Sequence, residues 1–323
     1  MAAVEVEGLR KTYGDVVAVD DLSFTIAEGE VFALLGPNGA GKTTTVEILE
    51  GHRARTAGSV RVLGHDPGAR SRELHERIGV VLQESGLDED FSVRELVRLY
   101  RGMYPRRRGV DAVIAQVGLA DKADARVKTL SGGQRRRLDL ALGLVGDPEL
   151  LFLDEPTTGF DPSARRRAWD MVEGLRALGT TVLLTTHYLD EAQHLTDRVG
   201  VLVRGRFVAL GRPDQLTAGQ AAAVVTFRLP AGTTAADLPA LDGALDADGP
   251  DLRLSTPRPT AALHALTGWA TARGLELPNL AVGRPSLEDV YLELVGAAPD
   301  GGPDADPDAE RATAASGAVT GEP

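Results

Sequence analysis

The sequence contains the stretch Gly36-Pro37-Asn38-Gly39-Ala40-Gly41-Lys42-Thr43, which fits the pattern G-x-x-x-x-G-K-[ST]. An apolar run at 31–35 precedes it and a helical pattern follows from Thr44, so the glycines occupy a strand-to-helix turn. At such a turn several backbone N–H groups point inward, and the helix N-terminus and Lys42 add positive charge. Thr43 supplies a hydroxyl that suits Mg²⁺. The stretch therefore predicts a binding site for a nucleoside triphosphate.

The composition indicates a globular protein, because 323 residues suggest about two domains and 43% of them are hydrophobic. Without cysteine, the chain forms neither disulfides nor thiolate metal sites. No apolar run approaches the roughly 20 residues that cross a bilayer, and the N-terminus lacks the features of a signal peptide, so we expect a cytoplasmic protein. The net charge of -12 argues against nucleic acid as a partner, because nucleic-acid binding depends on Lys and Arg contacts.

Hydrophobic periodicity predicts three parts: an α/β nucleotide-binding domain at 1–219, a small α+β domain at 220–296 and a disordered acidic tail at 297–323. Within the first part, helical periodicity between about 86 and 147 predicts a helical insertion. The tail is rich in Ala, Gly, Pro and Asp, and it buries too little apolar surface to offset the entropy of ordering. Strands are expected at 4–6, 22–26, 31–35, 59–64, 78–82, 150–153, 181–185, 199–203, 206–210, 223–229 and 252–255, and helices at 260–273 and 287–294.

A second motif, Leu130-Ser131-Gly132-Gly133-Gln134, lies shortly before an apolar run that ends in an acidic pair. Its small residues precede a helix, so the serine hydroxyl and the glycine amides form another anion-binding helix start. In the acidic pair, Asp154 suits Mg²⁺, which prefers oxygen ligands. Glu155, which points the other way if the strand alternation continues, could polarise an attacking water. His187 ends the next apolar run, where its imidazole could hydrogen-bond a γ-phosphate.

Each of these features also has a plainer interpretation. Serine and glycine before a helix can form a capping turn, an acidic pair at a strand end is usually solvated, and a histidine after two threonines is usually structural. Arginine clusters at 106–108, 135–137 and 165–167 are interpreted as solvated turns and helix surfaces, and not as a nucleic-acid footprint. The order of the motifs along the chain favours the functional interpretation.

Together the motifs resemble those of the ATP-binding cassette (ABC) transporter family over roughly the first two-thirds of the chain. The resemblance implies an α/β fold: a P-loop NTPase core of ABC ATPase type with an antiparallel β-subdomain and a helical insertion, plus a small α+β C-terminal domain. It implies an ATPase that uses ATP and Mg²⁺. The nucleotide-binding residues that it implies are Tyr13, Gly36, Pro37, Asn38, Gly39, Ala40, Gly41, Lys42, Thr43, Thr44, Ser131, Gly132, Gly133, Gln134 and Asp161.

The resemblance also assigns residues to hydrolysis. The catalytic residues that it implies are Lys42, Gln83, Glu155 and His187. The Mg²⁺ ligands that it implies are Thr43, Gln83 and Asp154. Phe160 stands where the family more often has leucine before the aspartate, and we expect altered packing there with the chemistry retained.

In the family, the motif that corresponds to Leu130–Gln134 is called the signature motif, and its serine faces the ATP held by a second cassette. This chain has one cassette, so the resemblance implies that Ser131 serves a second copy of the same chain in a homodimer. It also implies a separate integral-membrane permease whose cytoplasmic helices dock near Gln83 and the helical insertion. The protein would then be peripheral, at the cytoplasmic face of the cell membrane.

The stretch at 284–292, Arg-Pro-Ser-Leu-Glu-Asp-Val-Tyr-Leu, is similar to the closing motif of drug- and antibiotic-resistance ATPases of the daunorubicin-resistance type. The same stretch can also be interpreted as an amphipathic helix that packs on the small domain. With this similarity, the predicted function is to power export of a drug or antibiotic through the permease. Two alternatives stay open: the ATPase of a lipid or polysaccharide exporter or of an importer, and a soluble ABC ATPase that acts on ribosomes or DNA.

Overall fold

The computed structural model describes residues 1–82, 86–218, 223–230, 232–248, 251–283, 287–288 and 290–291. The described residues form two compact units, one up to Gly211 and one from Arg212 onward. The expected tail at 297–323, Gln83 and part of the expected helix at 287–294 lie outside the described residues. Within the described ranges, no helix is long and apolar enough to cross a bilayer.

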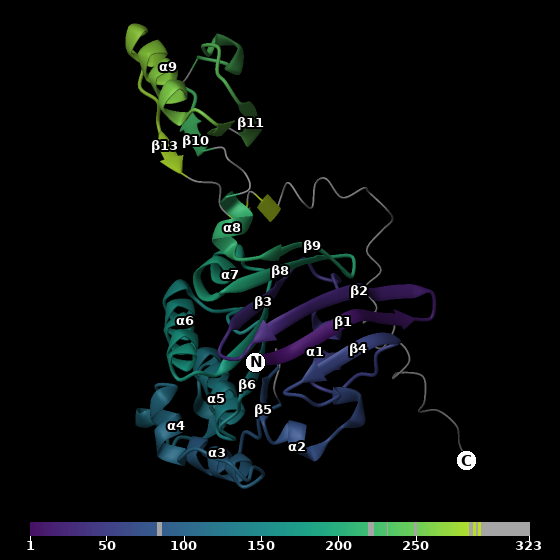
Figure 1. The fold of residues 1–323 in the computed structure, drawn as a ribbon. Helices are drawn as coiled ribbons and strands as arrows, with labels where there is room; N and C mark the ends of the chain where they lie inside the picture. The colour runs from purple at the N-terminus through teal and green to yellow at the C-terminus, as the bar shows by residue number, and fades with distance from the viewer. Residues whose placement is uncertain are drawn as a thin grey trace, which may run out of the picture. The chain divides into compact units, whose positions relative to one another are not determined.

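The core of the first unit is a six-stranded sheet (Figure 1). Its strands, in spatial order, are β5 (Ile78–Val81), β6 (Leu150–Asp154), β7 (Thr181–Thr186), β3 (Val31–Leu35), β8 (Arg198–Val203) and β9 (Arg206–Gly211). All neighbours pair in parallel except β8 and β9, which form an antiparallel hairpin. The strands β3 and β7 are buried along their whole length, as continuous apolar runs covered on both faces should be.

The carboxyl ends of these parallel strands bring three functional segments to one edge of the sheet. The register places Leu35 of β3 beside Thr186 of β7, and Asp154 of β6 beside Thr185 of β7. The glycine-rich loop follows Leu35 directly, and His187 follows Thr186. Ligands of open parallel sheets bind at this edge, so the fold itself defines the place of the site.

A three-stranded antiparallel sheet packs against the central sheet. Its strands, in spatial order, are β2 (Val16–Ala27), β1 (Ala2–Tyr13) and β4 (Ala57–Val62). One apolar core joins this sheet, the helix α1 (Lys42–Leu49) and the central sheet. In that core the rings of Phe24 and Phe32 stack with centroids 5.4 Å apart. The loop before α1 is therefore held between two sheets.

The helical insertion contains α3 (Val93–Arg101), α4 (Val110–Gln116) and α5 (Gly132–Leu144), which lie together in Figure 1. Ser92 and Glu95 form a capping box that begins α3. The longest helix among the described residues, α6 (Pro162–Ala177), begins with a proline in its first turn, a position where proline is favoured. The remaining helical segments of this unit are α2 (Arg72–His75), α7 (Leu189–Leu195), η1 (Pro67–Ala69), η2 (Ala120–Lys122) and η3 (Val127–Thr129).

The second unit is a four-stranded antiparallel sheet with a helix, α9 (Pro259–Ala272), packed on it. Its strands, in spatial order, are β11 (Ala244–Asp248), β12 (Asp251–Thr256), β10 (Ala223–Arg228) and β13 (Ala281–Gly283). The sequence analysis predicted β10, β12 and α9 but not the edge strands, which are short and contain Asp or Gly, residues depleted in strands. This unit also contains α8 (Pro213–Ala218) and η4 (Ala235–Asp237).

Candidate active site

The glycine-rich loop connects β3 to α1. Gly41 is the N-cap of α1 with a left-handed φ of 99°, and a Cβ there would lie 2.4 Å from the carbonyl oxygen of Ala18. A Cβ at Gly36 would lie 2.3 Å from the carbonyl oxygen of Leu202. Backbone of β2 and of β8 thus leaves no space for a side chain at either position, and this explains why the loop needs both glycines.

Lys42 begins α1 and is buried, with 6% of its surface exposed. Its Nζ donates hydrogen bonds to the carbonyl oxygens of Gly36 at 2.8 Å and Pro37 at 3.1 Å. Burial lowers the pKa of Lys42, and the nearby charges of Glu155 and Asp154 act in the opposite direction. A triphosphate bound in this loop would supply further negative charge to an ammonium group that is already partly desolvated.

The threonines after Lys42 differ in their accessibility. Thr45 is buried, and its hydroxyl donates to the carbonyl oxygen of Gly41 at 2.8 Å, so its role is to hold the start of α1. Thr43 is exposed and Thr44 is half-buried. These two hydroxyls are therefore the accessible ones at the loop.

Thr185 connects the two acidic residues of the site. Its Oγ1 donates to Oδ1 of Asp154 at 2.5 Å and accepts from the backbone N–H of Glu155 at 3.0 Å. Burial raises the pKa of Asp154, and the hydrogen bond from Thr185 partly offsets that shift. The sequence analysis did not identify Thr185. The pair Thr185-Thr186 before His187 was visible, but only the pairing of β6 with β7 shows which hydroxyl faces Asp154.

Glu155 does not continue the strand alternation on which its predicted direction depended. The strand β6 ends at Asp154, and Glu155 has a left-handed φ of 45°, a conformation that costs a non-glycine residue about 1–2 kcal/mol. Its carboxylate accepts a hydrogen bond from Thr158 Oγ1 at 3.0 Å, and its Oε1 lies 3.1 Å from Nδ1 of His187. The turn therefore directs the carboxylate toward His187, and backbone strain of this kind is concentrated at functional sites.

The signature motif begins α5 and lies at a different surface. Ser131 is the N-cap: its Oγ accepts from the N–H of Gln134 at 3.3 Å, and Oε1 of Gln134 accepts from the N–H of Ser131 at 2.9 Å. A groove of this surface is lined by Ser131, Gly133, Arg137, Phe160, Asp161 and Arg167, among others. Of the described residues that line the groove, none belongs to the loop at 36–43. The chain thus separates the signature from its own phosphate loop.

Asp161, which shares this groove, is the N-cap of α6. Its Oδ1 accepts from the N–H groups of Ser163 at 2.8 Å and Ala164 at 2.9 Å, and from the Ser163 hydroxyl at 2.7 Å. These hydrogen bonds, that of the Ser163 side chain first, lower the pKa of Asp161. Phe160, the departure from the usual leucine, lines the same groove and also a second cavity, and Arg137 and Ala168 line both as well.

Tyr13, the predicted adenine platform, ends β1 and is half-buried. The Nζ of Lys11 lies 4.8 Å and the Cζ of Arg53 lies 5.3 Å from its ring centroid. Cations over a tyrosine ring are a favourable arrangement in their own right. The stacking of adenine on Tyr13 stays a prediction, as do the roles of Gln83, which lies outside the described residues.

The donors at the sheet edge fit Mg²⁺ that is bound together with nucleotide phosphates. In the described part of the chain, no cluster of three or more His, Cys, Asp or Glu could hold a metal ion by itself. Mg²⁺ usually takes one or two protein oxygens and completes its shell with water and substrate phosphate. The hydroxyl of Thr43 and the carboxylate of Asp154 are oxygens of this kind.

Comparisons with known proteins show the family of this chain. A family profile described as ABC transporter matches residues 19–158, and one described as ABC transporter domain-containing protein-like, C-terminal domain, matches residues 223–286. The chain is 42% identical over 303 residues to Nod factor export ATP-binding protein I of Rhizobium sp. (strain N33), covering 91% of this chain and 97% of that protein. It is 41% identical over 306 residues to daunorubicin resistance ATP-binding protein DrrA3 of Streptomyces coeruleorubidus, covering 91% and 96%.

A solved structure gives the same result for the fold. The structure of cbiO1 from Clostridium perfringens, described as part of the ABC transporter complex cbiONQ, aligns with a TM-score of 0.61 and 30% identity. The alignment covers 67% of this chain and 91% of that chain. This chain belongs to the ABC transporter ATPase family. The predicted family, the cassette fold and ATP hydrolysis as the activity are confirmed. The roles of the individual residues in binding and hydrolysing ATP stay predictions.

Proposed function

We propose that this chain is the ATPase subunit of an ABC exporter that powers the transport of a drug or antibiotic through a separate membrane permease. The observation that carries the proposal is the separation of two half-sites within one chain. Lys42, Asp154, Glu155 and His187 gather at the sheet edge, whereas Ser131 lies in a groove that the phosphate loop does not line. The two half-sites complement each other if two copies face one another.

At the sheet edge, each residue has a defined task. The Lys42 ammonium neutralises the phosphates, and the backbone N–H groups of the loop hold them. Glu155 positions and polarises the attacking water, and His187, which contacts the same carboxylate, bonds the γ-phosphate through its other ring nitrogen. Thr43 and Asp154 would hold Mg²⁺, which supplies charge neutralisation when bound.

The groove completes the site of a second copy. The N-terminus of α5 carries the positive end of the helix dipole, and Ser131 and Gly133 line the groove there. Arg137 and Arg167 add positive charge to the same groove. Such a surface complements a triphosphate held in the partner's loop, so ATP would draw the two copies together and hydrolysis would release them.

The permease is the second partner. Apolar side chains are exposed at the end of β5 and on the helical insertion, where the sequence analysis placed the docking region: Leu82 is 49% exposed, Leu99 48% and Met103 61%. Exposed apolar groups on this part of the fold suit contact with another protein. A peripheral position on the cytoplasmic face of the membrane follows from this partnership.

The names of the relatives bear on the cargo. One is a daunorubicin resistance protein, which favours a drug or antibiotic, and another is a Nod factor export protein, which favours export of a different cargo class. One name states export, and the other states resistance to a drug, which removal of that drug from the cell would provide. Both favour an exporter over the importer and the ribosome- or DNA-directed alternatives. Export of a cargo other than a drug is therefore the second candidate.

Two measurements test the proposal. The chain is expressed with an affinity tag in its own host, and the membrane protein that co-purifies in ATP is identified. Compounds are then screened for stimulation of ATP hydrolysis by the assembled complex. We expect one permease and stimulation by drug-like compounds. Stimulation only by lipid-linked sugars would favour the second candidate, and the absence of any membrane partner would overturn the proposal.

A further inference from the structure

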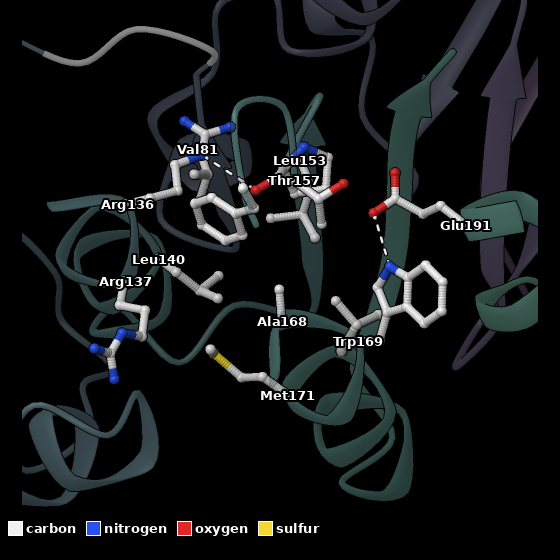
Figure 2. Close-up of a pocket in the computed structure, with 13 residues that line it drawn as sticks. Val81, Arg136, Arg137, Leu140, Leu153, Thr157, Ala168, Trp169, Met171 and Glu191 are labelled. Atoms are coloured by element: carbon white, nitrogen blue, oxygen red, sulfur yellow. Dashed lines mark hydrogen bonds between the residues drawn. The ribbon is translucent and has the colours of Figure 1, made fainter. Parts of the chain in front are cut away.

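Arg136 stands apart from the other arginines of the cluster at 135–137. Nη1 of Arg135 donates to Oε1 of Glu89 at 2.9 Å, and Nη1 of Arg137 donates to the carbonyl oxygen of Gly118 at 2.8 Å, so both of these hydrogen bonds join residues of the helical insertion. The guanidinium of Arg136 turns instead toward the strand ends of the central sheet, as Figure 2 shows. The sequence analysis interpreted the cluster as part of a helix surface and did not single out Arg136, which is half-buried.

The guanidinium of Arg136 binds backbone carbonyl groups of two separate segments. Its Nη2 donates to the carbonyl oxygens of Asp154 at 2.7 Å and Glu155 at 3.3 Å, and its Nε donates to that of Pro156 at 3.4 Å. Its Nη1 donates to the carbonyl oxygen of Leu82, the residue that follows β5. One side chain of the signature helix thus holds the backbone at the end of β5 and at the end of β6.

Charge and burial make this contact costly to lose. Burial lowers the pKa of Arg136, and the charges of Asp139, Asp154 and Glu155 oppose the shift. A guanidinium stays protonated throughout the accessible pH range, so a desolvated positive charge persists here. A buried charge without hydrogen-bond partners is strongly unfavourable. The carbonyl acceptors replace the water that Arg136 loses on burial, so removal of these contacts should be costly.

The contact also fixes the strained turn at Glu155. The N–H of Glu155 is bound by Thr185 Oγ1 and its carbonyl by Arg136, so both peptide units that flank its Cα are held. With φ at 45°, this turn persists only where surrounding contacts over-determine it. Arg136 therefore helps to set the direction of the Glu155 carboxylate by holding the backbone carbonyl of the same residue.

The same helix begins at the groove proposed to receive the partner's triphosphate. Arg136 lies five positions after Ser131, the N-cap of this continuous helix, which corresponds to about 7.5 Å along the helix axis. A rigid helix transmits a displacement of its N-terminus directly to the Arg136 side chain. We infer that Arg136 is a positioning residue that couples occupation of the groove at Ser131 to the alignment of Glu155 for hydrolysis. This inference rests on the proposed pairing of two cassettes.

Substitutions at Arg136 separate this role from a purely structural one. Lysine keeps the charge but lacks the planar fork that reaches Leu82 and Asp154 together, and glutamine keeps a polar side chain without the charge. Arg135→Gln is the matched control, because it removes the same charge from the same helix and the described hydrogen bonds of Arg135 go to Glu89 and Lys128 of the insertion.

The full-length chain is purified with each substitution, and its ATP affinity, kcat and KM are measured. For Arg136→Gln we expect kcat to fall about tenfold or more, with ATP affinity and KM within about twofold of wild type, since the loss is in alignment and not in binding. Arg136→Lys should recover part of kcat, and Arg135→Gln should match wild type. If Arg136→Gln lowers the yield of folded protein, Arg136→Lys carries the test alone.

A second readout distinguishes failure of this inference from failure of the proposed pairing. In the background of Glu155→Gln, ATP-dependent dimers are measured with and without Arg136→Gln. If ATP-dependent dimers form in Glu155→Gln with and without Arg136→Gln, and the single variant Arg136→Gln has the kcat of wild type, the proposed role of Arg136 is overturned. The absence of ATP-dependent dimers in Glu155→Gln itself would overturn the pairing of cassettes and the coupling with it. A raised KM with unchanged kcat would assign Arg136 to nucleotide binding and would also overturn the inference.

Discussion

The imidazole Nδ1 of His187 lies 3.1 Å from Oε1 of Glu155, although the two residues belong to the ends of different strands. In the proposed function, this contact leaves the other ring nitrogen, Nε2, to bind a phosphate. It also orients the glutamate proposed to act on water, so we expect the effects of removing Glu155 and of removing His187 not to add.

The first prediction concerns the role of Glu155. Glu155→Gln keeps the hydrogen bond from Thr158 but removes the charge that polarises water, so ATP should still bind while turnover falls by about 100-fold or more. An ATP-bound dimer should then accumulate in size-exclusion chromatography. Glu173→Gln, a substitution on the exposed face of α6, is the control and should hydrolyse ATP like wild type. Full turnover of Glu155→Gln would remove Glu155 from its assigned role.

The second prediction concerns the groove at Ser131. Ser131→Arg places a bulky side chain where the partner's triphosphate would enter, so each chain should bind ATP while ATP-dependent dimerisation and turnover are lost. Thr267→Arg adds the same group to an exposed position of α9 and should leave both unchanged. Binding is measured by equilibrium dialysis and dimerisation by light scattering. Persistent dimers in Ser131→Arg would place the groove outside the interface.

The third prediction concerns Thr185, which the sequence analysis did not select. Thr185→Val keeps the shape but leaves the Asp154 carboxylate and the Glu155 N–H without their shared partner, which should destabilise the protein by about 1–3 kcal/mol. The kcat for ATP should fall as well, because the turn at Glu155 loses one of its restraints. Thr185→Ser retains the hydroxyl and should keep most of the activity. Urea unfolding and steady-state kinetics check both effects, and equal behaviour of the two variants would contradict the role of the hydroxyl.

The fourth prediction concerns pH and Glu191, a fully buried carboxyl on α7. The indole N–H of Trp169 donates to its Oε1 at 3.2 Å, and Figure 2 shows the two side chains facing each other. Burial raises the pKa of Glu191 above its ordinary 4.5, and the charge of Asp190 acts in the same direction. The folded state therefore holds this proton more tightly than the unfolded state does.

A raised pKa in the folded state means that stability is lost as pH rises from about 4.5 through the folded-state pKa of Glu191. Glu191→Gln is neutral at every pH and should remove this loss. We expect the free energy of unfolding of Glu191→Gln, relative to wild type, to increase between pH 5 and pH 8. The comparison within one pair of proteins cancels the other titrating groups. A difference that stays constant over this range would show that Glu191 titrates at its ordinary pKa.

Much of the first unit was predictable because buried parallel strands are continuous apolar runs. The strands β3, β6 and β7 and the helices α5 and α6 follow from periodicity, small residues and capping signals. The helix α7 and the edge strands β11 and β13 were not predicted, because each is short and gains its stability from tertiary packing and not from its own pattern.

The sequence by itself determined the chemistry of this protein: a glycine loop with Lys42, an acidic pair at a strand end, His187 and a serine–glycine helix start, in the order of an ABC ATPase. Only the tertiary structure decided which side chains act on one another. Thr185 faces Asp154 because β6 and β7 pair in one register, and Arg136 reaches carbonyl groups 18 to 54 residues away because α5 packs against the strand ends. Periodicity reports the direction of a side chain relative to its own element, whereas contacts between elements depend on how the whole chain packs.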